Sequence, residues 1–257
     1  MILLEVPKLT LSTELIIPMA ISWVVMIVSA LLVLLFASLL HFSKEITGAL
    51  LLVSVLTNST FIGIPIITAY LGSGSLPFII VYDQIGSFLA LSTFGTFVAS
   101  YYAHKSKVNF SIIFFKVISF PPFIALIIAL LIKDIDFSFQ VTSFLYLLAS
   151  LIVPFALFAV GLQLQFRLPK DELKAFTVSL FIKLIIAPIV AIITAYSLGW
   201  EGLATQVSIM EAGMPPMITA AALASMVGLA PRLSAAIVGY GILFSFVTTA
   251  ILFQFIS

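Results

Sequence analysis

Apolar residues follow one another in long runs along this chain, and short polar pieces separate the runs. A helix needs about 20 mostly apolar residues to cross a hydrocarbon core about 30 Å thick. Runs of this length occur over residues 13–41, 46–71, 76–103, 109–132, 138–166, 173–198, 202–228 and 231–256. The pattern therefore predicts an all-α integral membrane protein with about eight transmembrane helices.

The second of these spans contains residues that interrupt a helix. The stretch TNSTFIGIPIITAYLG, residues 57–72, carries an amide at Asn58 and then Gly63 and Pro65. Gly has a low helix propensity, and Pro removes a backbone donor and clashes with the preceding turn. Because hydrocarbon offers no water to the backbone groups that a break frees, a break at this depth indicates a specific structural or functional use.

The seventh span carries a similar interruption. Its sequence, IMEAGMPPMITAAALA, places Met214, Pro215 and Pro216 in the middle of an apolar run. Residues 64–69 align with residues 215–220, and each stretch leads into a short Gly-containing loop and one more apolar span. The two spans begin on opposite membrane faces, so the relation between them is an inverted repeat.

This repeat divides the chain into two parts with three and five helices. The first, residues 1–107, is a truncated repeat with the crossover helix 46–71. The second, residues 108–257, contains the crossover helix 202–228 and begins with the helices of 109–166. The inverted repeat is therefore incomplete.

Two broken helices in corresponding positions are typical of the binding site of a secondary transporter. Each break leaves N–H groups at the start of the second half-helix and C=O groups at the end of the first. These ends carry partial positive and negative charge, so an anion and a cation can both bind near the midplane. The residues expected to line this site are Asn58, Gly63, Pro65, Met214, Pro215 and Pro216.

The composition supports a membrane protein and excludes several other classes. Hydrophobic residues make up 63% of the chain, charged residues 8%, and the mean hydropathy is +1.32, whereas a soluble domain carries about 25% charged residues. The net charge of +1 and the absence of a long basic cluster give no indication of a nucleic-acid partner. With no Cys, no nucleophile–base set, no metal-ligand cluster and no cofactor fingerprint, the sequence predicts no enzyme and no cofactor.

The loop charges predict an orientation. Cations concentrate on one face, and the positive-inside rule assigns that face to the cytoplasm. The cytoplasmic set is Lys44, Lys105, Lys107, Arg167, Lys170, Lys174 and Arg232, and the outer set is Lys8 and Lys133. With eight spans, this predicts a multi-pass protein of the cell membrane whose two termini are both extracytoplasmic.

Two charged residues lie deep within the predicted spans. Lys183 and Glu211 are each about nine residues from the start of their spans, on opposite faces, which is about 13 Å of depth. A charge at this depth is energetically expensive and indicates a functional site. Two interpretations are open: Glu211 exchanges a proton during transport, or it forms a static ion pair with Lys183.

Two further polar residues are candidates for the same site. Asp83 lies one or two turns into the third span and could line the substrate path or serve a solvated structural role. Asn58 could hydrogen-bond the substrate or the facing crossover, or it could form an ordinary interhelical hydrogen bond, worth well under about 2 kcal/mol.

The ordered set of motifs resembles the auxin efflux carrier family of membrane transporters. Asn58-x-x-Phe61-x-Gly63-x-Pro65 resembles the N-x-x-F-x-G-x-P crossover motif of that family, and IIVYDQIGS follows at the expected place. The family helices are matched further by SFPPFIALIIALLI, LIVPFALFAVGLQL, FIKLIIAPIVAIITAYSLG, MPPMITAAALAS and LSAAIVGYGILFSFVTTAILF.

The resemblance implies an architecture and a partner. Family members usually have ten helices in two inverted repeats, and the first span here resembles the third, so the first two are expected to be missing. Those two helices, with the sixth and seventh, form a scaffold against which the core moves. Here only the helices of 109–166 would remain of it. One flank of the core would then face lipid uncovered, and a second copy in a homodimer could cover it.

The sequence thus predicts a secondary transporter that moves a small organic anion, such as a carboxylate, and the resemblance implies alternating access of the elevator type. Positive half-helix starts and Lys183 favour an anion, and H⁺ or Na⁺ are the coupling ions considered. Two alternatives remain open. One is a sodium-coupled symporter resembling the bile-acid carriers, and the other is a non-transporting membrane sensor or assembly protein that retains the crossover fold.

Overall fold

A computed structural model describes residues 2–5, 13–103, 121–132, 137–151, 154, 155, 158 and 170–256 of the chain. Helices make up nearly all of these ranges, and no β-strand forms within them, which confirms the all-α prediction. Four helical runs among the described residues are long and apolar enough to cross a membrane. They are Thr13–Leu39, Ser73–Tyr102, Leu173–Ser197 and Pro231–Ile256.

The first and last of these runs are single long helices, and the other two change geometry along their length. The first contains η2 (Thr13–Leu15) and α2 (Ile16–Leu39), and the last is α15 (Pro231–Ile256). The second run contains η4 (Ser73–Ser75), α5 (Leu76–Val81), η5 (Tyr82–Phe88), η6 (Leu91–Gly95) and α6 (Thr96–Tyr102). The third, preceded by η7 (Lys170–Glu172), contains α11 (Leu173–Phe181), η8 (Ile182–Ile186) and α12 (Ala187–Ser197).

Two predicted spans are interrupted in the structure, as the sequence indicated. The first crossover helix consists of α3 (Lys44–Val53), an unwound segment at residues 54–58, and then η3 (Ser59–Gly63) with α4 (Ile64–Leu71). The second consists of α13 (Leu203–Ala212), an unwound segment at residues 213–217, and α14 (Ile218–Met226).

The two unwound segments pair with each other. Thr57 and Pro216 form an isolated antiparallel bridge. The amide of Asn58 donates to the carbonyl of Pro215 at 3.0 Å, and the amide of Met217 donates to the carbonyl of Leu56 at 3.0 Å. Because no water is available at this depth, this pairing satisfies backbone groups that the breaks would otherwise leave without partners.

The first break lies earlier in the chain than the sequence suggested. Gly63 and Pro65 were expected to interrupt the helix, but Gly63 ends η3 and Pro65 lies in the first turn of α4. Proline is tolerated in a first helical turn because the N–H that it lacks needs no helical partner there. The helix therefore starts just before these two residues instead of stopping at them.

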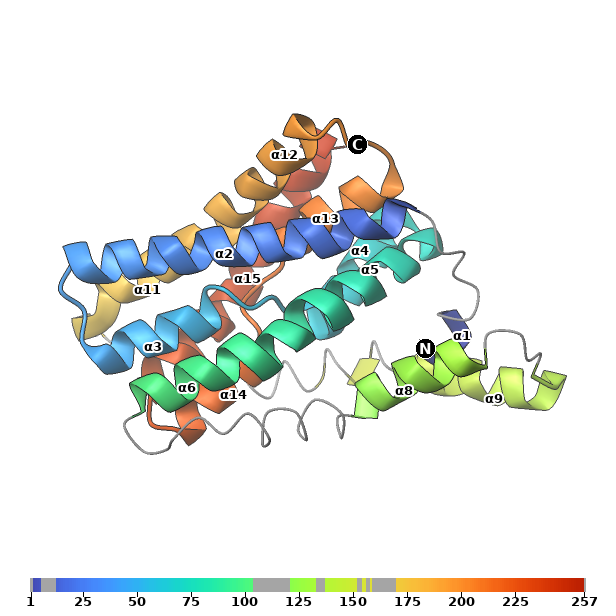
Figure 1. Cartoon of the computed structure of the whole chain (residues 1–257), viewed down its shortest axis with the longest axis horizontal. Coiled ribbons are helices and arrows are strands. Elements are labelled where there is room, and N and C mark those ends of the chain that lie inside the picture. The colour runs from blue at the N-terminus through green and yellow to red at the C-terminus, as the bar shows by residue number, and fades with distance from the viewer. Residues whose placement is uncertain are drawn as a thin grey trace.

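The remaining described helices lie beside this core. α8 (Pro121–Leu131) and α9 (Phe139–Ser150) belong to the predicted scaffold-like region, about half of which lies outside the described residues. In Figure 1 both helices lie at the lower right, away from α12. The short α1 (Ile2–Glu5) contacts both of them. Of the cations used to predict the orientation, Lys8, Lys105, Lys107, Lys133 and Arg167 also lie outside the described residues. Orientation and repeat boundaries stay predictions.

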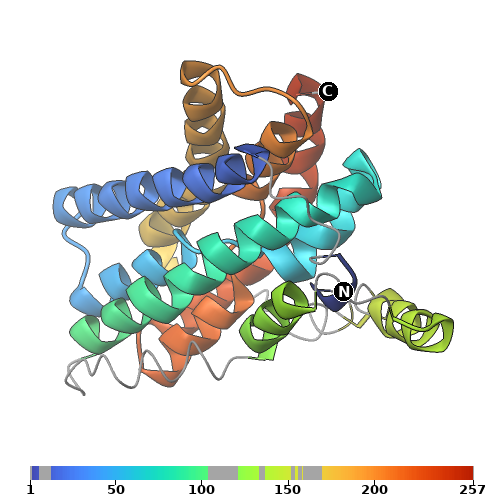
Figure 2. The same cartoon turned by 45° about the vertical axis from the view of Figure 1, so that its right-hand side comes forward.

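The bundle is apolar outside and carries its polar side chains inside. α2 packs along α12 and α13 and along η5, as the two views show (Figures 1 and 2). The outer faces of α2 and α15 expose large apolar side chains such as Leu31 and Val247, each at 61%. Polar residues such as Ser54 and Ser179 are fully buried, and their hydroxyl groups are hydrogen-bonded at 2.7 Å. This distribution suits a lipid environment.

Gly241 of α15 allows the paired segments to pack closely against that helix. A Cβ atom at this position would lie 2.6 Å from Cδ of Pro216 and 3.3 Å from Cδ2 of Leu180. The Pro216 ring is rigid and lies in the bridge, so it has little freedom to move away.

We therefore expect Gly241→Ala to lower the free energy of unfolding by about 1–3 kcal/mol, as other overpacked cores do. The measurement is the melting temperature of the purified protein in detergent. Gly74→Ala is the control, because its Cβ would make an ordinary contact of 3.6 Å with Leu203. Equal melting temperatures for the two variants would contradict the close-packing argument.

Candidate functional site

Buried polar side chains from four spans surround the paired breaks. We call this set the crossover cluster: Thr57, Asn58, Ser59, Tyr82, Asp83, Gln84, Ser87, Lys183 and Glu211. Lys183 and Glu211 are each 0% exposed, and the other members are 8% exposed or less. A set of buried polar groups at this density is expensive in an apolar interior, so it marks the candidate functional site.

Three of the contributing helices have π-helical geometry where they meet the cluster. Ser59 starts η3, Tyr82 starts η5 and Lys183 is the second residue of η8. A π turn holds one more residue than an α turn and frequently occurs at functional sites. The widened η5 also presents the carbonyl of Ile85, which accepts a hydrogen bond from the Trp23 ring at 3.0 Å. At these wide turns the polar side chains point into the bundle, while the backbone groups remain hydrogen-bonded.

Lys183 connects the two breaks. Its Nζ donates to Oγ1 of Thr57 at 2.6 Å and to the carbonyl of Ala212 at 3.4 Å. Thr57 belongs to the first unwound segment, and Ala212 is the last residue of α13. The C-terminal end of a helix carries partial negative charge, so the ammonium group stabilises the end of the first half-helix there.

Glu211 lies one residue before that helix end. Among the described residues no donor makes a well-formed hydrogen bond to either carboxylate oxygen, and the hydroxyl group of Ser59 is the donor near enough to act on them. A Cβ atom at Gly63 would lie 2.6 Å from Oε1 of Glu211, so the carboxylate rests directly against the backbone of η3. Asp83 and Lys183 are near enough to act on it electrostatically. Lys183 donates its hydrogen bonds to Thr57 and Ala212 and acts on Glu211 through its charge, so proton exchange by Glu211 and a static ion pair with Lys183 both stay predictions.

Asp83 is buried in the cluster, so the solvated role considered for it is wrong. Its Oδ2 accepts a hydrogen bond from Nε2 of Gln84 at 2.7 Å, while Oε1 of Gln84 has no donor among the described residues. The short distance of Asp83 from the preceding loop predicts a position near the membrane surface. The structure instead turns it inward on η5, toward the charge of Glu211.

Donor groups also meet at the crossing. Nδ2 of Asn58 is buried and has no acceptor among the described residues. The N-cap residues Asn58 and Met217 make no side-chain cap to η3 and α14, so these caps leave the first N–H groups of both half-helices available. Together with the positive ends of two helix dipoles, these donors form an environment suited to an oxyanion.

The other predicted residues take supporting positions. Met214, Pro215 and Pro216 are buried in the second unwound segment, and the amide of Met214 donates to the carbonyl of Glu211 at 3.0 Å. Pro65 is only partly buried, at the start of α4.

Five members of the cluster are not predicted as site residues from the sequence: Thr57, Ser59, Tyr82, Gln84 and Ser87. Thr57 accepts the hydrogen bond of Lys183. The hydroxyl groups of Ser59 and Ser87 pair at 3.0 Å, across 28 residues of sequence. A polar residue in an otherwise apolar span is the signal that the sequence offers for all five.

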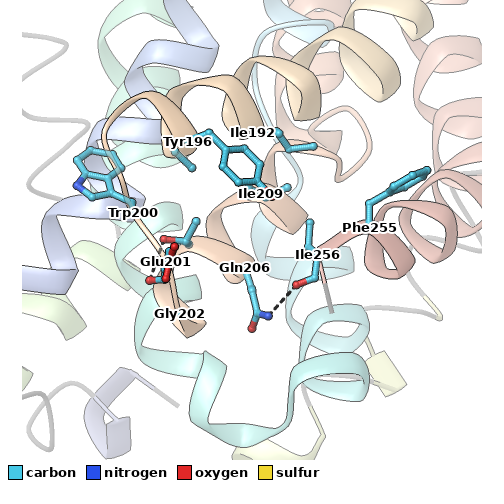
Figure 3. A pocket seen from close by; sticks show the side chains of 11 residues that line it. Ile192, Tyr196, Trp200, Glu201, Gly202, Gln206, Ile209, Phe255 and Ile256 are labelled. Atoms are coloured by element: carbon cyan, nitrogen blue, oxygen red, sulfur yellow. Dashed lines mark hydrogen bonds between the residues drawn. The ribbon is translucent and has the colours of Figure 1, made fainter.

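A pocket of about 490 Å³ lies at the far end of α13, away from the crossing (Figure 3). The ends of α12 and α15 form its other walls, with Tyr196 and Phe255 among the lining side chains. Figure 3 shows Gln206 donating to the carbonyl of Ile256, at 2.8 Å. The pocket reaches Ile209, two residues before Glu211.

Paired broken helices around buried charges are the arrangement found at the binding sites of membrane transporters. The sequence matches the family described as membrane transport protein over residues 5–253. The chain therefore belongs to the membrane transport protein family, which confirms the resemblance to the auxin efflux carriers.

A relative from Methanothermobacter thermautotrophicus carries the name uncharacterized transporter. This chain is similar to it, with 28% identity over 179 residues, which is 69% of this chain and 58% of the relative. The match thus spans little more than half the length of that relative. The absence of two N-terminal helices stays a prediction.

The contact between Gly63 and Glu211 leads to a testable coupling. Gly63→Ala forces the flexible carboxylate end of Glu211 to move, so it should lower the free energy of unfolding by about 1 kcal/mol, the low end of the overpacking range. In a Glu211→Ala background the obstacle is gone, and the same substitution should cost little. A double-mutant cycle of melting temperatures in detergent measures the difference. Additive effects of the two substitutions would show that the contact does not constrain Gly63.

Proposed function

We propose that this protein is a secondary transporter that moves a small organic anion carrying a carboxylate, together with a proton. The observation that carries the proposal is Glu211, a fully buried carboxylate without a well-formed hydrogen bond among the described residues, in the same cluster as the unpaired Nδ2 of Asn58. Membership of the membrane transport protein family supports transport as such.

The donors favour an anionic substrate. A substrate carboxylate at the crossing can accept hydrogen bonds from Asn58 Nδ2 and from the free N–H groups that begin η3 and α14. Such charge-assisted hydrogen bonds are stronger than neutral ones. A cationic substrate would instead meet two positive helix ends, so it is disfavoured.

The charges favour a proton as the coupling ion. The cluster holds one ammonium group, Lys183, and two carboxylates, Asp83 and Glu211, so a substrate carboxylate would add a third buried negative charge. A proton on Glu211 offsets that charge and also gives the carboxyl group a donor. Release of the substrate then favours release of the proton.

Alternating access completes the proposed mechanism. Movement of the crossover-bearing helices against the scaffold-like helices of 109–166 would carry the cluster between the two membrane faces. A homodimer would cover the lipid-facing flank of the moving part. Both elements of the proposal follow from the resemblance to the auxin efflux carriers.

The experiment begins with a thermal-shift screen of carboxylates, followed by uptake of the labelled hit into proteoliposomes. An inward proton gradient should stimulate uptake several-fold in the wild-type protein. Glu211→Gln should abolish that stimulation, because the amide cannot carry the proton, while exchange of substrate without a gradient continues. Glu201→Gln is the matched control, since this residue is exposed before α13.

Retention of the gradient dependence by Glu211→Gln would contradict proton coupling through this residue. Stimulation by a sodium gradient alone would favour the sodium-coupled alternative. Binding of the carboxylate without any flux would favour a non-transporting sensor.

A second substitution tests the donor set. Asn58→Leu removes the free amide, so the KM for the substrate should rise about 10- to 100-fold, the effect of one lost hydrogen bond to a charged group. Gln206→Leu is the control, because it removes an amide at the pocket end of α13. An unchanged KM for Asn58→Leu would exclude the amide from substrate binding.

A further inference from the structure

We propose that Lys183 is a tethered cation of the crossover, whose ammonium group takes the place that a sodium ion would otherwise fill. The protein then needs no sodium for stability or for transport. The inference about transport rests on the function proposed above, whereas the inference about stability does not.

The ligands of the ammonium group are those of a hard metal ion. Nζ of Lys183 contacts one hydroxyl oxygen, of Thr57, and one backbone carbonyl oxygen, of Ala212. Hydroxyl, carbonyl and carboxylate oxygens are preferred by hard cations. In broken-helix transporters, cations are coordinated by the carbonyl ends of half-helices, and Ala212 is such an end.

The surrounding charges require a cation at this point. The negative end of α13, Glu211 and Asp83 lie around the crossing, and Lys183 is the cation that acts on Glu211 among the described residues. Without a positive charge the cluster would bury two carboxylates in an apolar bundle, which is strongly unfavourable. A bound ion can dissociate, but a side chain cannot.

The residue type fits this role. Lysine carries a compact point charge with three donors, whereas the guanidinium of arginine is a broad planar fork. The ammonium group reaches the crossing from η8, on a span that is not itself broken there. It therefore links both breaks to a third helix, as a shared metal ion would.

The test compares melting temperatures of the wild type and Lys183→Met in sodium chloride and in N-methylglucamine chloride at equal ionic strength, without substrate. Methionine keeps the length of the side chain but leaves the oxygen ligands free. Sodium at ten times its dissociation constant should raise the melting temperature of the variant by roughly 3–6 °C. The wild type and the control Lys174→Met, which changes an exposed lysine at the start of α11, should melt equally in both salts.

A double variant, Lys183→Met with Glu211→Gln, should lose much of the sodium response because it lacks the nearby negative charge that attracts the cation. Recovery of folded Lys183→Met only from sodium-containing buffer supports the inference as well. The inference would be overturned if Lys183→Met had the same melting temperature in sodium, lithium, potassium and N-methylglucamine, or if it failed to fold in all four. Specific stabilisation of the wild type by sodium would also overturn it. Because no substrate is present, failure of the proposed transport function would leave these melting results unchanged.

Discussion

The backbone pairing between the two unwound segments is the interaction on which the rest of this structure depends. Two helices stop in the middle of an apolar bundle, where no water can bond their ends. The hydrogen bonds from Asn58 to Pro215 and from Met217 to Leu56 allow these breaks because each segment supplies the partners of the other. Lys183 strengthens the same crossing from a third helix. The half-helices can keep N–H groups available at their starts only because this backbone pairing holds the two breaks together.

The buried polar groups at the crossing lower the stability of the protein, and the close packing of the surrounding helices offsets this loss. Glu211 is buried without a well-formed hydrogen bond among the described residues, which lowers stability, while the surrounding helices contribute an apolar core and very close backbone contacts. Buried polar groups that are only partly satisfied are common where a protein must bind and release a ligand. The cluster is therefore more readily explained as a site that changes partners than as a structural element.

Much of this arrangement could be predicted from sequence because hydrocarbon imposes simple rules. Span limits follow from run length, and Pro215 and Pro216 break the seventh span because adjacent prolines cannot continue a helix. The first break was misplaced because Pro65 is tolerated in a first turn. The π turns and the bond between Lys183 and Thr57, 126 residues apart, depend on contacts between distant segments, which a single sequence does not reveal.

The bridge between Thr57 and Pro216 also makes the two halves of the chain sensitive to changes in length. Extended segments present alternate side chains to opposite faces, so a slip of one residue reverses every side chain. An inserted or deleted residue in either segment would therefore turn Thr57 away from Lys183. Replacement of residues can be accommodated here much more easily than a change in their number. In the evolution of this protein, the lengths of the two breaks are thus expected to be inherited together.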